Sequence, residues 1–169
     1  MIIPWVLYLS YGDKHLLEEQ YASMVAWVEF VRGRVDADHI WRQDFQFGDW
    51  LDYRGAFALK GSPVTNDELV ATAFFAYSSD LLTKMAHILG KNNDADQYAT
   101  LAQQVKDAFT NEFVTTGGRV GPNSQTAYVL ALHFDLLPEA MRAPVGWIAT
   151  AACVNYWPMK EPTSCSHRN

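Results

Sequence analysis

The sequence of 169 residues predicts an all-α protein of about five or six antiparallel helices. Apolar residues recur every three or four positions in long stretches, the spacing of one face of a helix. Glycine, proline and capping residues stand between these stretches, where helices end and begin. Strand signals are scarce, apart from a short pairing expected around Arg119-Val120. The predicted helices alternate between amphipathic and more apolar ones, which is typical of paired helices in an α/α array.

Two helices are predicted before a long connection. An apolar segment runs from Pro4 to about Tyr11 and ends at Gly12. Asp13 then offers an N-cap to a helix predicted over Asp13–Gly33. The apolar face of this second helix is formed by Leu17, Tyr21, Met24, Val28 and Val31.

Three more helices are predicted after the connection, over Asn66–Leu89, Asp94–Val114 and Asn123–Leu137. Thr65 and Glu68 have capping-box spacing at the start of the first of these. Its expected apolar face is Val70, Phe74, Tyr77, Leu81, Met85 and Ile88; that of the second is Tyr98, Leu101, Val105, Phe109 and Phe113. The third is apolar almost all round and is expected to be buried on several sides.

The C-terminal part has a different character. The run Ala143-Pro144-Val145-Gly146-Trp147 is expected to break the next helix, because proline removes a backbone donor. Residues 158–169 are polar and are expected to be unstructured. We therefore divide the chain into a helical domain, residues 1–142, and a divergent tail, residues 143–169.

Composition narrows the classes of partner. Apolar residues make up 49% and charged residues 19%, which excludes a disordered chain. The net charge of −6 argues against nucleic acid and against an anionic membrane. Cys153 and Cys165 show no metal-ligand spacing, so neither a metal nor a cofactor is expected. The N-terminal apolar run lacks a basic lead-in and is too short to span a bilayer, which predicts a cytoplasmic protein.

The connection from Asp44 to Tyr53 carries the strongest functional signal. It holds three carboxylates and four aromatic rings: Asp44, Asp49, Asp52, Phe45, Phe47, Trp50 and Tyr53. An aromatic ring covers the C–H face of a sugar while a carboxylate accepts from its hydroxyls, so this composition indicates a site for a neutral sugar. The alternative is that the rings anchor a long connection to the core.

A set of short motifs lies in order along residues 2–141: Ile3-Pro4-Trp5-Val6-Leu7-Tyr8, Tyr11-Gly12-Asp13, Leu17-Glu18-Glu19-Gln20-Tyr21, Met24-Val25-Ala26-Trp27-Val28, Phe47-Gly48-Asp49-Trp50-Leu51 and Thr126-Ala127-Tyr128-Val129-Leu130-Ala131-Leu132. Together they resemble the catalytic domain of bacterial α-L-rhamnosidases, glycoside hydrolase family 78. The resemblance implies part of an (α/α)6 toroid and an α-L-rhamnoside ligand. It also implies inverting hydrolysis by an acid and a base, with no metal requirement.

The resemblance is incomplete. In the family, the motif with the general acid precedes the segment that corresponds to this chain, and the general base follows it. Neither has a counterpart in this sequence. A full toroid has twelve helices, so we expect this chain to be an internal part of a rhamnosidase-like domain.

The resemblance also suggests site residues. The family counterpart of Trp50 lines the rhamnose pocket, so Trp50 is predicted to contact the sugar. Asp49 is expected to orient its loop or bind hydroxyls, although an Asp in such a turn also caps backbone N–H groups. Phe47 and Tyr77 are further candidates for substrate binding. Tyr77 lies with Phe75 on a helix that could reach a pocket, and core packing is the alternative for both.

Hydrolysis by this chain alone would need two carboxyl groups, about 6.5–9.5 Å apart for inversion. Asp44 and Asp49 are the candidates, although nothing around them predicts the raised pKa that a general acid needs. Three hypotheses remain open: a small glycosidase, a sugar-binding protein without the chemistry, and a helical interaction protein.

We also expect a homodimer or a higher oligomer. A partial toroid leaves the flanks of its first and last helices bare. The apolar runs Ile2–Leu9 and Ala127–Leu137 would then expose more than the few hundred Å² usual for a monomer. Alternatively, the segment from Trp147 to Trp157 folds back over part of this surface.

Overall fold

The computed structural model describes residues 1–42, 44–49 and 64–156, with side chains described as far as residue 150. These ranges contain six helices: α1 (Ile2–Tyr11), α2 (His15–Arg32), α4 (Asp67–Ile88), α5 (Asn92–Phe113), α6 (Gln125–His133) and α7 (Glu139–Tyr156). The β pairing found in the same ranges is one antiparallel bridge between Val114 and Val120. The all-α prediction and the short pairing are both confirmed.

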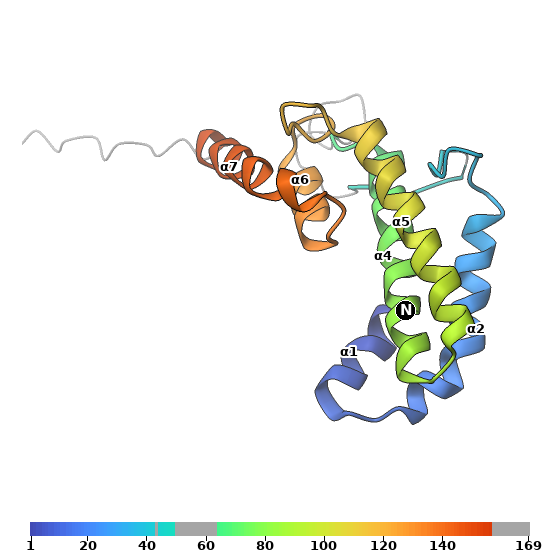
Figure 1. The fold of residues 1–169 in the computed structure, drawn as a ribbon. Helices are drawn as coiled ribbons and strands as arrows, with labels where there is room; N and C mark the ends of the chain where they lie inside the picture. Colours follow the sequence, from blue (N-terminus) through green and yellow to red (C-terminus); the bar gives the residue numbers. More distant parts are fainter. Residues whose placement is uncertain (43, 50–63, 157–169) are drawn as a thin grey trace, which may run out of the picture.

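The helices form three successive hairpins, α1–α2, α4–α5 and α6–α7, with α4 at the centre. Figure 1 shows the long helices α2, α4 and α5 side by side, with α1 near one end of them and α6 and α7 near the other. Helix α4 contacts α1, α2, α5 and α6. None of the described helices is long and apolar enough to cross a membrane.

Two tyrosine hydroxyls join α2 to α5. Tyr21 donates to Asp94 Oδ2 at 2.8 Å, and Tyr98 donates to Glu29 Oε1 at 3.1 Å. The earlier residue of α2, Tyr21, pairs with the earlier residue of α5, and the later residue of α2, Glu29, pairs with the later one. Helices α2 and α5 therefore run in the same direction, opposite to α4. Burial, reinforced by the bond to Glu29, raises the pKa of Tyr98 to about 12. Burial and the Asp94 carboxylate likewise raise the pKa of Tyr21.

The apolar faces of α2 and α5 are buried as predicted, whereas the prediction for α4 was partly wrong. Of the six residues assigned to its face, Leu81 and Met85 are buried, but Phe74 is 39% exposed. Phe75, its neighbour, is 1% exposed and lies in the core. Helix α4 is surrounded by other helices and buries residues on several sides, so a single stripe does not describe it.

Local signals placed most helix ends correctly. Gly12 closes α1 with φ 69°. The N-cap of α2 is Lys14 and not the predicted Asp13, although Asp13 Oδ1 accepts from the backbone N–H of His15 at 2.8 Å. The capping box expected at Thr65 is absent, because α4 begins at Asp67 without a side-chain cap. Helix α6 ends at His133, earlier than the predicted Leu137, since Asp135 takes a left-handed φ of 56°.

The helix break expected at residues 143–147 was wrong. Helix α7 runs from Glu139 to Tyr156 with Pro144 inside it. A proline removes one backbone hydrogen bond from a helix, and this loss is offset where a neighbour is anchored in the core. Val145 is fully buried, while Trp147 is 78% exposed. The division at residue 142 remains a prediction about domain organisation.

Candidate carbohydrate-binding site

The segment of residues 44–49 lies against the first residues of α4 and α6. Asp49, which is half-buried, makes the joining contacts. Its Oδ2 accepts from Thr126 Oγ1 at 2.7 Å and from Thr65 Oγ1 at 3.1 Å. Through these contacts, residues 44–49 of the connection lie at the N-terminal ends of α4 and α6.

A third hydroxyl extends this cluster into the interior. Thr65 and Ser124 are 0% and 1% exposed, and their Oγ atoms lie 2.7 Å apart. Ser124 is also the N-cap of α6, because its Oγ accepts from the backbone N–H of Ala127 at 3.2 Å. The capping role therefore belongs to Ser124, whereas the Thr65 hydroxyl, expected to cap α4, binds Asp49 and Ser124.

Gly48 allows a close approach between the segment and α4. Its φ is 52°, and a Cβ built on it would lie 1.9 Å from Asp67 Oδ1. A residue other than glycine would be strained there and would displace the Asp67 side chain. The sequence Gly48-Asp49 is thus fitted to the start of α4.

Asp44 is fixed by two strong donors. Arg34 Nη1 donates to its Oδ1 at 2.7 Å, and Trp41 Nε1 donates to its Oδ2 at 2.8 Å. Trp41 itself is 7% exposed, and its backbone N–H donates to Thr72 Oγ1 at 3.1 Å. Through Arg34, Asp44 therefore fixes the start of the segment near the end of α2.

A cleft of about 500 Å³ opens between this segment and the start of α4. Its size falls within the usual range of small-ligand sites. Its lining is mostly polar, with one tryptophan: Trp41, Arg42, Asp44, Gln46, Thr65, Asn66, Asp67 and Glu68. Amide and carboxylate groups beside an indole ring are suited to a neutral polyhydroxylated ligand.

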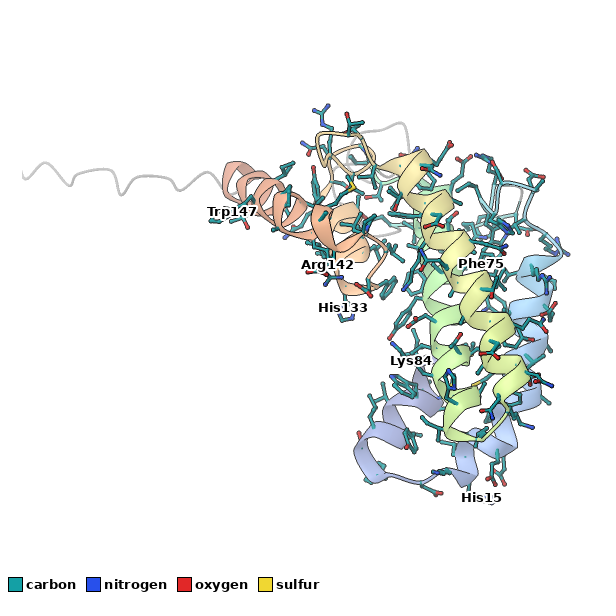
Figure 2. The ribbon with its side chains drawn as sticks, viewed as in Figure 1. His15, Phe75, Lys84, His133, Arg142 and Trp147 are labelled. Atoms are coloured by element: carbon teal, nitrogen blue, oxygen red, sulfur yellow. The ribbon has the colours of Figure 1, made fainter. Side chains whose placement is uncertain are left out.

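The predicted aromatic residues have different environments. Phe47 is 66% exposed and packs edge to face with Phe45, their ring centres 5.1 Å apart. Tyr77 is half-buried and stacks on Phe134, with ring centres 4.1 Å apart. Phe75, on α4, lies in the core, while Trp147 lies exposed on α7 (Figure 2). Trp50, Asp52 and Tyr53 lie outside the described residues.

The family is decided by a match over most of the chain. Residues 1–156 match the model of the bacterial alpha-L-rhamnosidase 6 hairpin glycosidase domain. The chain belongs to this family. The partial six-hairpin fold expected from the sequence is thereby confirmed, and the three hairpins described above are units of that architecture.

Several alpha-L-rhamnosidases are similar to this chain in sequence. That of Streptomyces avermitilis is 36% identical over 140 residues, 83% of this chain and 12% of the relative. That of Alteromonas sp. (strain LOR) is 39% identical over 145 residues, 82% of this chain and 15% of the relative. This chain therefore spans a small part of the length of the rhamnosidases that it matches.

Solved rhamnosidase structures share the fold. The Streptomyces avermitilis alpha-L-rhamnosidase complexed with L-rhamnose superposes with a TM-score of 0.78 and 33% identity, over 91% of this chain and 14% of that one. The native enzyme from Aspergillus terreus gives a TM-score of 0.79 and 33% identity, over 91% and 18%. The first of these contains the monosaccharide that the sequence motifs suggested as ligand.

The sequence analysis did not identify the residues that hold residues 44–49 in place. Thr65, Ser124 and Thr126 were read as helix starts or as part of a motif, and none was proposed for the site. The one available signal was the presence of Thr126 in the motif that resembles the family. Within the described residues, no group of three or more His, Cys, Asp or Glu side chains could hold a metal ion.

Proposed function

We propose that this chain is the carbohydrate-binding part of a rhamnosidase domain and takes an α-L-rhamnoside beside residues 44–49. The observation that carries the proposal is the exposed Phe45–Phe47 pair on a segment whose Asp44 and Gln46 line the cleft. Aromatic rings bind the C–H face of a sugar, and the amides and carboxylates of the cleft bind its hydroxyls. The L-rhamnose bound to the related Streptomyces enzyme supports the same class of ligand.

We assign the two carboxylates of the segment to structure and not to catalysis. A general acid must carry a proton to the leaving group, and a general base must face a water molecule. Both oxygens of Asp44 accept hydrogen bonds, and Asp49 Oδ2 accepts two. Hydrolysis then requires carboxyl groups from other segments of a rhamnosidase domain, and this chain alone binds without cleaving.

Titration of the chain with L-rhamnose, followed by calorimetry, tests this function. Phe47→Ala is expected to weaken binding about tenfold, because the ring is solvent-accessible and its removal uncovers the sugar face. Trp147→Ala is the control: this ring is also exposed, but it lies on α7, which contributes no residue to the lining of the cleft. Equal losses in both variants, or no binding by the unaltered chain, would contradict the proposal. Cleavage of a chromogenic α-L-rhamnoside that disappears in Asp49→Asn would instead support a small glycosidase.

We also propose that two copies associate through α1. The other flank that was expected to be bare, Ala127–Leu137, is largely buried, although Val129 within it is 55% exposed. Helix α1 is almost entirely apolar, yet none of its residues is buried, and Ile3 is 73% exposed. A groove of about 810 Å³ runs beside it, lined by Met1, Ile2, Ile3, Pro4, Leu7, Leu16, Gln20, Trp27 and Ser78. A two-fold contact between the α1 helices of two copies covers this apolar surface on both of them.

Light scattering at tens of micromolar is expected to give the mass of a dimer. Ile3→Glu should shift the mass to that of a monomer, because it places a charge in the apolar groove. Ser10→Glu changes an exposed residue of the same helix outside the groove and should leave the dimer intact. A stable monomer for the unaltered chain would rule out this association.

A further inference from the structure

The Asp49 cluster joins residues that are far apart in the sequence. Asp49 is separated from Thr65 by 16 positions and from Thr126 by 77, while Thr65 and Ser124 are separated by 59. The start of α4, the start of α6 and the segment 44–49 therefore meet at one carboxylate. An arrangement of this kind fixes three elements relative to one another.

The direction of each hydrogen bond follows from the chemistry of the groups. An ionised carboxylate only accepts, so Thr65 and Thr126 each donate their single hydroxyl proton to Asp49. Thr65 has then no proton left for Ser124, so Ser124 must donate to Thr65. The Ser124 oxygen in turn accepts from the N–H of Ala127. A chain of hydrogen bonds thus runs from the α6 N-terminus to Asp49, and each bond in such a chain polarises the next.

We propose that Asp49, together with Thr65, Ser124 and Thr126, is a positioning group that holds Phe47 for carbohydrate binding. The inference rests on the proposed function, in which the segment 44–49 contacts the sugar. Asp49 acts through the neighbouring ring and does not itself touch the reacting atoms. Because Gly48 is wedged against Asp67, a loss of the Asp49 contacts releases the segment on the side of α6.

Thr126 is the point at which this positioning is tested most cleanly. It is half-buried, it makes the shorter of the two bonds to Asp49, and valine is likewise branched at Cβ but lacks the hydroxyl. Thr126→Val removes one hydrogen bond to a charged acceptor, which corresponds to about a tenfold change in an equilibrium. Thr126→Ser keeps the hydroxyl and should restore the unaltered behaviour.

Two readouts are measured for each variant: hydrogen exchange of the amides of residues 44–49, and affinity for L-rhamnose. In Thr126→Val, exchange in this segment is expected to accelerate about tenfold and the affinity to fall about tenfold, while amides of α5 stay unchanged. Thr126→Ser is expected to match the unaltered chain within about twofold. Thr110→Val is the control for a general loss of stability, because the Thr110 hydroxyl donates to Leu136 O at 3.1 Å, away from the segment.

The possible outcomes separate this inference from the proposed function. Unchanged exchange of residues 44–49 in Thr126→Val would overturn the positioning role, whether or not rhamnose binds. Faster exchange with unchanged affinity would overturn the link between the cluster and the ligand. If the unaltered chain binds no rhamnose, the proposed function fails, and the exchange data still decide whether the cluster holds the segment. An equal loss of affinity in Thr110→Val would show that Thr126→Val weakens binding through a general loss of stability, which would overturn the positioning role.

Discussion

Replacement of Phe75 by alanine is expected to lower the free energy of unfolding by about 3–5 kcal/mol. Phe75 is a residue of α4, and its side chain is 1% exposed and lies in the hydrophobic core. Its loss removes a large apolar surface and leaves a cavity that rigid neighbouring helices fill incompletely. Urea denaturation followed by circular dichroism measures the change, with an unaltered dependence on denaturant showing that the same structure unfolds.

Phe74→Ala provides a control at the adjacent position. Phe74 has the same side chain but is 39% exposed, and its ring meets Phe134 edge to face at 5.0 Å. Its replacement is expected to cost about 1 kcal/mol, the value of a partly exposed aromatic contact. The pair of variants decides whether Phe75 serves the core or a pocket. A small loss of stability for Phe75→Ala, accompanied by weaker rhamnose binding, would show that Phe75 contacts the ligand and does not serve mainly in the core.

Gly48→Ala is expected to destabilise the protein by about 2 kcal/mol and to weaken rhamnose binding by more than Thr126→Val does. An L-residue at the observed φ of 52° costs about 1–2 kcal/mol. The new Cβ would also lie 2.9 Å from Asp67 Cγ and 3.5 Å from Asp67 Cα. The carboxylate can rotate away, but it then leaves the first turn of α4, where the helix dipole favours a negative charge.

Gly117→Ala is the matched substitution for this prediction. A Cβ at Gly117 meets no atom within 4 Å. Thermal unfolding and rhamnose titration should therefore leave Gly117→Ala close to the unaltered chain and separate it clearly from Gly48→Ala. Similar stability and affinity for both variants would show that the approach of Gly48 to Asp67 is not needed.

Much of the fold could be predicted from local patterns. The buried faces of α2 and α5 follow from helical spacing, because each of these helices packs against the core on one side. Helix α4 is surrounded, so the spacing of its large residues did not reveal that Phe75 is buried and Phe74 exposed. Pro144 misled the prediction for α7 because the local cost of a proline is outweighed by the anchoring of Val145 in the core.

The candidate site could be predicted only in outline. Composition and resemblance identified the segment with Asp44, Phe47 and Asp49, and the role of Asp49 in orienting its loop was among the alternatives. The partners of Asp49 depend on how distant helices meet, and no local pattern encodes that. The spacing of Thr65 and Glu68 predicted that the Thr65 hydroxyl caps α4. In the structure this hydroxyl instead donates to the Asp49 carboxylate, because a hydrogen bond to a charged acceptor is stronger.

The separation of Asp49 from Thr126 by 77 positions bears on the order in which the molecule folds. The hairpin of α4 and α5 is built from contacts close in sequence, so it can form early, whereas closing a long loop carries an entropic cost that must be met before its contacts form. Residues 44–49 therefore acquire their final position only after α6 has docked. During synthesis, the ribosome must add Ser124 and Thr126 to the chain before residues 44–49, which are made much earlier, can take up their final position.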